Sequence, residues 1–180
     1  MFEAVKARSD SSLPRAHTAS PPVDIPEIDT AGALLLADLQ DRVDAFEMLI
    51  GQCYKAELGL GATAVDGGAH YGTHTGPMAR LVGPRGRVHA FEPLPFAAAE
   101  LRRMFAAHPQ VSVHQKALAE REGTGSFNCI VNDPARSSLL KRDLGSAPLQ
   151  SREIEVETTT LDQLAAAPVR FIKLDVEGYD

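Results

Sequence analysis

The sequence has few cysteines, no surplus of basic residues and no long apolar run, and each absence excludes a class of protein. Cys53 and Cys129 are far apart and outside any metal-binding spacing, which predicts reduced packing residues rather than a disulfide. The 18 Lys and Arg residues are outnumbered by 24 acidic residues, and no basic surface stands out that would suit a nucleic acid. The longest apolar stretch, Ala31–Ala37, is too short to span a membrane, and no signal peptide is recognisable. We therefore expect a cytoplasmic protein with no nucleic acid and no membrane as partner.

Two short apolar runs, each ending in a carboxylate, define the stretch Ala62–Pro93. Thr63–Val65 is β-branched and too short for a helix, so it predicts a buried parallel strand that stops at Asp66. The pattern then predicts a helix over Gly72–Val82 and a second strand over Arg87–Phe91. Such a βαβ unit is expected to bind its ligand above the carboxyl ends of the strands.

The turn after the first strand suits a cationic nucleoside better than a dinucleotide. Glu92, at the tip of the second strand, can accept hydrogen bonds from both hydroxyls of a ribose, which a nicotinamide dinucleotide also carries. In a dinucleotide register, however, Ala69 would replace the glycine that meets the pyrophosphate, and Asp66 would repel the phosphates. An ammonium, a sulfonium and a ribose suit an acid at each strand end, and S-adenosylmethionine carries all three. A nicotinamide-dependent oxidoreductase stays open as the alternative.

Four blocks, VDGGAHYGTHT, VHAFEP, KALAE and FIKLDVEG, occur in this order along the chain. In these blocks the sequence resembles the FkbM-type S-adenosylmethionine-dependent methyltransferases from about Leu58 to the last residue, with His70 where that family commonly has Asn. The resemblance implies a Rossmann-like class I methyltransferase fold of the α/β type with bound S-adenosylmethionine. It also implies O-methylation of a hydroxyl on a sugar or polyketide-type small molecule, and it places the backbone around Ala117 beside the adenine.

The expected site residues lie at the ends of the predicted strands. Those expected to bind the cofactor are Asp66, Gly67, Gly68, Ala69, His70, Tyr71, Gly72, Glu92, Pro93 and Ala117. Asp175 and Glu177, at the end of a strand over Val169–Val176, are the expected catalytic residues, and His70 is a further candidate for the base. Lys173 lies inside this strand and needs a carboxylate partner, for which Asp66 and Asp175 are nearest. No metal is predicted, because His70 and His74 lack a third ligand at a recognisable spacing.

Three segments are predicted. Residues 1–30, with several Pro and Ser, predict a mobile arm. Residues 31–58 predict an amphipathic helix that lies on the domain, with a short coiled-coil dimer as the alternative. Its apolar seam comprises Leu36, Leu39, Val43, Phe46, Ile50 and Cys53. Residues 59–180 predict the S-adenosylmethionine-binding domain, in which Gly123–Asn132 and Glu153–Thr159 form an antiparallel excursion around the loop Asp133–Gln150.

The resemblance also implies that the sequence supplies only part of the methyltransferase sheet. The complete fold has about seven strands, of which we expect the four with the order 3-2-1-4, with the C-terminal strands missing. A C-terminally truncated methyltransferase of this kind is expected to be inactive or nearly so. It is also expected to self-associate through the helix 31–58 or the uncovered strand 169–176. A non-catalytic cofactor-binding fragment is a second alternative.

Overall fold

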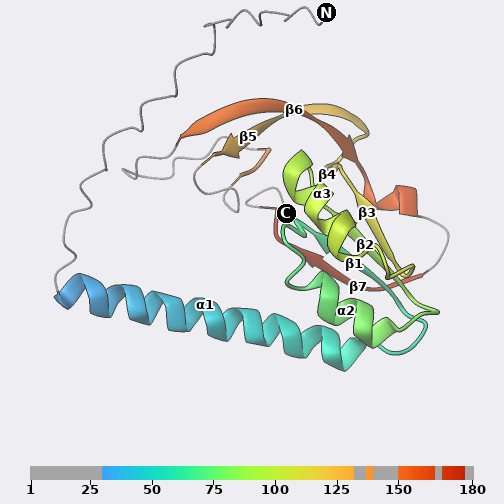
Figure 1. Cartoon of the computed structure of the whole chain (residues 1–180), viewed down its shortest axis with the longest axis horizontal. Helices are drawn as coiled ribbons and strands as arrows, with labels where there is room; N and C mark the ends of the chain where they lie inside the picture. The colour runs from blue at the N-terminus through green and yellow to red at the C-terminus, as the bar shows by residue number, and fades with distance from the viewer. Residues whose placement is uncertain (1–29, 132–136, 140–149, 165–167, 177–180) are drawn as a thin grey trace, which may run out of the picture. The chain divides into compact units, whose positions relative to one another are not determined.

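The computed structural model describes residues 30–131, 137–139, 150–164 and 168–176 (Figure 1). The chain divides into two units, Met1–Asp41 and Arg42–Asp180. The first unit is described only as the beginning of helix α1 (Thr30–Glu57), and the sheets and remaining helices belong to the second. The predicted arm up to residue 29, most of the predicted loop 133–150 and Glu177 lie outside the described residues.

Four parallel strands form the main sheet, in the order β3-β2-β1-β7. They are β1 (Thr63–Gly67), β2 (Arg87–Phe91), β3 (Val111–His114) and β7 (Val169–Leu174). Every residue of β1 is buried, as a central parallel strand covered on both faces requires. The predicted order 3-2-1-4 is confirmed, with β7 as its fourth strand, and the chain has a Rossmann-like α/β fold.

Helix α2 (Thr75–Val82) links β1 to β2, and α3 (Pro95–Met104) links β2 to β3. The sequence predicts the first of these helices from Gly72, but it begins three residues later. The reason is the backbone of Gly72, whose φ of 79° is left-handed and incompatible with a right-handed helix. Pro95 stands in the first turn of α3, where its fixed φ suits the helix.

The end of α1 and the length of α2 cover one face of the main sheet. Tyr54 and Leu58 of α1 form a buried cluster with Met78 and Val82 of α2 and with Val88 of β2. Met78, Val82 and Val88 have no exposed surface. Because each apolar side chain of this size contributes roughly 1.5–3 kcal/mol when buried, this cluster fixes the start of β1 and the position of the loop that follows it.

The expectation that the apolar seam of α1 packs on the domain is wrong within the second unit, whereas the coiled-coil alternative stays a prediction. Val43, Phe46 and Cys53 are exposed, Phe46 by 64%, whereas Ile50 packs against the core. The covered row runs from Ile50 to Tyr54 at a spacing of four. Apolar residues at alternating spacings of three and four residues suit a partner that packs along the whole helix. In this structure only the last turns of α1 contact the core.

A second sheet has the order β4-β6-β5 and packs against the start of α3. Its strands are β4 (Ala117–Leu118), β5 (Gly123–Ile130) and β6 (Ser151–Thr159). Because β5 and β6 are antiparallel, the predicted excursion is confirmed, whereas the parallel pairing of β4 with β6 was not predicted. Ser138, after the first gap in the described residues, exchanges two backbone hydrogen bonds with Asn128, of 2.8 and 3.2 Å.

Candidate active site

The turn between β1 and α2 is a tight loop held against the end of β2. The amides of Gly68 and Ala69 both donate to the carbonyl oxygen of Phe91 at 3.0 Å. Gly68 has a φ of 71°, and a β-carbon there would collide with the carbonyl oxygen of Asp175. His70 has a left-handed φ of 44°, which is uncommon for a residue with a side chain. Both conformation and space therefore require a glycine at position 68.

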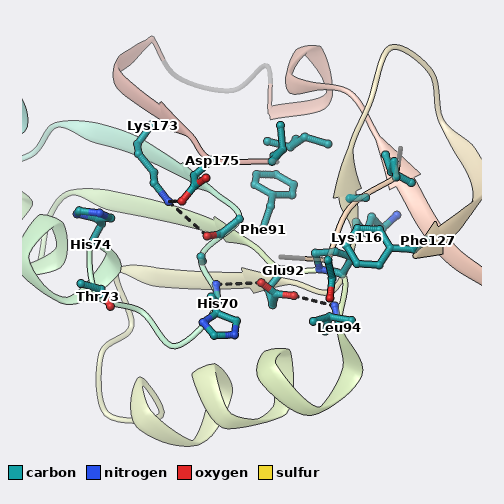
Figure 2. Close-up of a pocket in the computed structure, with 18 of the residues that line it drawn as sticks. His70, Thr73, His74, Phe91, Glu92, Leu94, Lys116, Phe127, Lys173 and Asp175 are labelled. Carbon is teal, nitrogen blue, oxygen red and sulfur yellow. Dashed lines mark hydrogen bonds and ion pairs between the residues drawn. The ribbon is translucent and has the colours of Figure 1, made fainter. Parts of the chain in front are cut away.

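Glu92 is a buried carboxylate that follows β2 and lines a cavity beside this loop. Its Oε2 accepts a hydrogen bond from the amide of His70 at 2.9 Å, and its Oε1 accepts one from the amide of Leu94 at 2.8 Å (Figure 2). Burial raises the pKa of Glu92, and these two hydrogen bonds oppose the rise. The carboxylate is thus fixed in position, and its remaining lone pairs can accept hydroxyl donors.

A second buried carboxylate, Asp66, lies behind the loop. Its Oδ2 accepts a hydrogen bond from Thr75 Oγ1 at 2.6 Å, and its Oδ1 lies 3.4 Å from Lys173 Nζ. Lys173 Nζ also donates to the carbonyl oxygen of Gly68 at 3.3 Å and lies 3.7 Å from Asp175 Oδ2. The expectation that Lys173 pairs with Asp66 or Asp175 is confirmed for both.

The cavity has a volume of about 420 Å³, which lies in the range of small-molecule sites. Figure 2 shows His74, Lys173 and Asp175 at one end and Lys116 and Phe127 at the other. The charged end also includes Glu47 of α1. The opposite end is mostly apolar, because Leu94, Ala117 and Leu139 line the cavity and pack in one cluster with Phe127. A ligand with an apolar ring at one end and charge at the other would suit this lining.

Most of the predicted site residues line the cavity: Gly68, Ala69, His70, Glu92, Pro93, Ala117 and Asp175. Gly67 and Gly72 are not among the lining residues, and they shape the loop from behind. Tyr71 is half exposed and does not line the cavity either. Asp66 is engaged beneath the loop, and Glu177 lies outside the described residues. The binding and catalytic roles of these residues stay predictions.

Sequence reasoning missed several lining residues, of which His74, Glu47 and Phe127 are the most informative. His74 drew attention only as a metal ligand with His70, and the four-residue spacing said nothing of a cavity. Glu47 adjoins the predicted seam of α1, so the error in that seam hid the face on which it lies. Phe127 stands in an alternating strand whose buried face was readable, but the surface it packs against was not.

Two kinds of site are not found within the described residues. No group of three or more His, Cys, Asp and Glu side chains there is placed to hold a metal ion. His74 instead directs Nε2 at Glu47 Oε2, 2.8 Å away. None of the helices in this part of the chain is both long and apolar enough to cross a membrane.

A parallel sheet in the order β3-β2-β1-β7, with a glycine turn after β1 and a buried acid after β2, defines a Rossmann-like methyltransferase fold of class I. The chain belongs to the FkbM methyltransferase domain family, which matches residues 66–180. The resemblance carried by the sequence blocks is therefore confirmed, and the methyltransferase class with it. No curated protein matches this chain.

Similar solved structures include three bacterial proteins described as methylases or methyltransferases. A putative rRNA-methylase from Clostridium thermocellum has 25% identity, a TM-score of 0.37 and coverage of 38% of this chain. A SAM-dependent O-methyltransferase from Thermotoga maritima has 20% identity, a TM-score of 0.35 and coverage of 40% of this chain. A methyltransferase from Geobacter sulfurreducens has 18% identity, a TM-score of 0.33 and coverage of 50% of this chain. The match spans 39%, 28% and 49% of the length of these proteins, respectively. With overlaps this partial, the family assignment rests on the domain match.

Proposed function

We propose that the protein is an S-adenosylmethionine-dependent O-methyltransferase acting on a hydroxyl of a sugar or polyketide-type small molecule. The observation that carries the proposal is Glu92, which is 4% exposed and lines the cavity. Two backbone amides fix its oxygens, and the carboxylate retains the capacity to accept both hydroxyls of a ribose. Hydrogen bonds of this kind are strengthened where water is largely excluded.

The rest of the cavity suits the other parts of S-adenosylmethionine. Leu94, Ala117 and Phe127 offer an apolar, partly aromatic surface for the adenine. At the opposite end, the carboxylates of Glu47 and Asp175 supply negative charge for the ammonium and the sulfonium. When bound, S-adenosylmethionine supplies an electrophilic methyl group.

The chain's own residues then have to orient the acceptor and remove its proton, because the methyl donor is already activated. Asp175, the predicted catalytic residue, directly follows β7 and lines the charged end of the cavity. Its carboxylate can accept a hydrogen bond from an acceptor hydroxyl and so orient it. Glu177, the other predicted catalytic residue, lies outside the described residues.

A neutral hydroxyl acceptor is also supported by charge. The net charge of the chain is −6, and the end of the cavity opposite the apolar surface carries the carboxylates of Glu47 and Asp175 against the single ammonium of Lys173. Both features oppose a polyanionic nucleic acid as acceptor, since such partners are bound mainly by Lys and Arg. The family assignment favours methyl transfer over the nicotinamide-dependent oxidoreductase considered from the sequence.

The experiment combines binding and transfer. Calorimetry compares S-adenosylhomocysteine with NAD⁺, and tritiated S-adenosylmethionine is incubated with a panel of methyl glycosides and macrolactone alcohols. We expect binding of S-adenosylhomocysteine but not of NAD⁺, and base-stable label in at least one alcohol. Binding of NAD⁺ alone would indicate the oxidoreductase. Binding of S-adenosylhomocysteine without transfer to any alcohol would indicate the non-catalytic alternative.

A further inference from the structure

The charged end of the cavity contains a carboxylate–imidazole pair that the predicted site does not include. His74, the residue before α2, is 6% exposed and lines the cavity together with Glu47 of α1. Its Nε2 lies 2.8 Å from Glu47 Oε2, and the ring of Tyr54 packs edge-on against the imidazole at 5.9 Å. Contacts from two sides therefore fix the orientation of the ring.

The pairing decides which nitrogen of His74 carries the proton when the imidazole is neutral. A carboxylate can only accept, so Nε2 holds the hydrogen that points at Glu47, and Nδ1 is left with a lone pair. Nδ1 is buried and has no hydrogen-bond partner among the described residues. A buried acceptor without a donor is costly. Nδ1 has almost no accessible surface in the free protein, so a bound hydroxyl would satisfy it after a shift of the ring or its neighbours on ligand binding.

The position of the pair relative to Glu92 gives it a role in the proposed reaction. With the ribose on Glu92 and the adenine at the apolar end, the transferable methyl group belongs at the opposite end of the cavity. Figure 2 shows His74 at that end, near Lys173 and Asp175. We propose that His74 is the general base that deprotonates the acceptor hydroxyl, and that Glu47 positions it. This inference rests on the proposed function.

In the balanced step, the hydroxyl oxygen forms a bond to the methyl carbon, and the carbon–sulfur bond breaks with its electron pair left on sulfur. The hydroxyl proton moves to Nδ1 of His74. The resulting imidazolium faces the carboxylate of Glu47 across 2.8 Å, so the positive charge is compensated where it forms. The products are a methyl ether and a neutral thioether.

Asp175 is a weaker candidate for the same task. Its side chain is 58% exposed, and its Oδ2 lies 3.7 Å from the ammonium of Lys173. The carboxylate is therefore open to solvent and already faces a cation, whereas His74 is enclosed and paired with a carboxylate. Asp175 is therefore better suited to hold Lys173 and to orient the acceptor, and His74 to move the proton.

The test uses His74→Gln, His74→Ala and Glu47→Gln with the methyl glycoside or macrolactone most rapidly labelled by the wild type. We expect kcat of His74→Gln to fall by about 10²- to 10⁴-fold with little change in KM. Imidazole added to His74→Ala should restore part of the lost rate, and Glu47→Gln should fall between the wild type and His74→Gln. Calorimetric affinity for S-adenosylhomocysteine should stay within about twofold in His74→Gln and His74→Ala, because neither removes Glu92, the apolar end or a carboxylate assigned to the ammonium. Glu47→Gln removes one of those carboxylates, so its rate is compared at saturating cofactor. His108→Gln, at an exposed histidine outside the cavity, is the matched control.

A readout without cofactor or acceptor completes the test. Long-range nitrogen NMR of the protein alone, recorded at a pH at which the imidazole of His74 is neutral, should show its proton on Nε2. A proton on Nδ1 would overturn the inference, and so would turnover by His74→Gln within tenfold of the wild type. If the wild type labels no alcohol, the proposed function fails instead, and with it the reaction assigned to His74.

Discussion

Lys173 and Asp66 are register partners on the adjacent strands β7 and β1, and their side chains form a buried ion pair. Nζ and Oδ1 are 3.4 Å apart, and the side chains are only 7% and 1% exposed. The same Asp66 accepts the hydroxyl of Thr75 at the start of α2, and the same Lys173 donates to the carbonyl of Gly68. The position of the glycine loop therefore depends on one cation and its carboxylate.

Replacing Lys173 by Met should destabilise the fold strongly. The substitution leaves Asp66 buried without its cation, and removing one partner of a buried pair typically costs about 3–5 kcal/mol. Urea unfolding followed by circular dichroism measures this loss as a lower transition midpoint. In the double variant Lys173→Met/Asp66→Asn the uncompensated charge is gone, so its stability should exceed that of Lys173→Met. A loss below about 1 kcal/mol in the single variant would mean that water reaches the pair.

Gly68→Ala should destabilise the protein by about 1–3 kcal/mol, because the left-handed φ and the carbonyl of Asp175 both oppose a β-carbon. Gly59→Ala is the matched control, since a β-carbon there meets nothing within 4 Å. Thermal unfolding of the two variants gives the comparison. Equal melting temperatures would show that the loop does not have the conformation described.

The corrected face of α1 is tested by two aromatic residues of that helix. Tyr54 is 4% exposed and packs edge-on against His74 and Phe171, whereas Phe46 is 64% exposed. Tyr54→Ala should cost about 3–5 kcal/mol, the usual loss for a large buried aromatic. Phe46→Ala should change stability by no more than about 0.5 kcal/mol. If chemical denaturation showed a larger loss of stability for Phe46→Ala than for Tyr54→Ala, the seam predicted from the sequence would be the packed face of α1.

Two histidines on β2 and β3 predict a loss of stability in mild acid. His89 Nδ1 and His114 Nε2 are 3.1 Å apart, and their rings are stacked. Burial lowers the pKa of His89, with a smaller effect of Arg87. Burial also lowers the pKa of His114, and the neighbouring charges of His89, Lys116 and Arg102 lower it further. Just below the ordinary histidine pKa of 6.5 the unfolded chain binds more protons than the folded one, so stability falls as pH drops through that value.

The measurement for this pair is the difference in melting temperature between the wild type and His89→Gln/His114→Gln across pH 5–8. The wild type should lose more stability on acidification than the double variant. Comparing the two proteins cancels the opposite contribution of Glu92, whose raised pKa favours the folded state as pH falls. His108→Gln, at an exposed histidine, should keep the wild-type slope. Parallel curves for the wild type and the double variant would contradict the prediction.

The strands of the main sheet could be predicted because each is a short apolar run bounded by a turn residue or a carboxylate, and their order was implied by the family resemblance. Prediction failed where conformation depends on the backbone of one residue. The sequence does not show whether a glycine in a helical pattern has a positive or a negative φ. The start of α2 was therefore predicted at Gly72 instead of Thr75. The face of α1 was misassigned because periodicity does not reveal how much of a helix meets the core.

The candidate site divides in the same way. Glu92 and the glycine loop were predictable, since both lie at strand ends in one βαβ unit. Glu47 and Phe127 come from elements far from that unit in sequence, and only the packing of α1 and the second sheet brings them to the cavity. Asp66 was expected both to contact the cofactor and to pair with Lys173; the pair is present beneath the loop, and the cofactor contact stays a prediction.

The most direct test of the proposed S-adenosylmethionine site is the calorimetric affinity of Glu92→Ala for S-adenosylhomocysteine. Removing the carboxylate deprives the ribose hydroxyls of a charged acceptor, which should cost roughly 1.5–3 kcal/mol, or about ten- to a hundredfold in affinity. Glu92→Gln, which keeps the shape of the side chain, should also bind more weakly, and Glu122→Ala, at an exposed position outside the cavity, should bind like the wild type. Circular dichroism confirms that each variant is folded. Wild-type affinity in a folded Glu92→Ala would contradict the proposed ribose site and the cofactor assigned to this cavity.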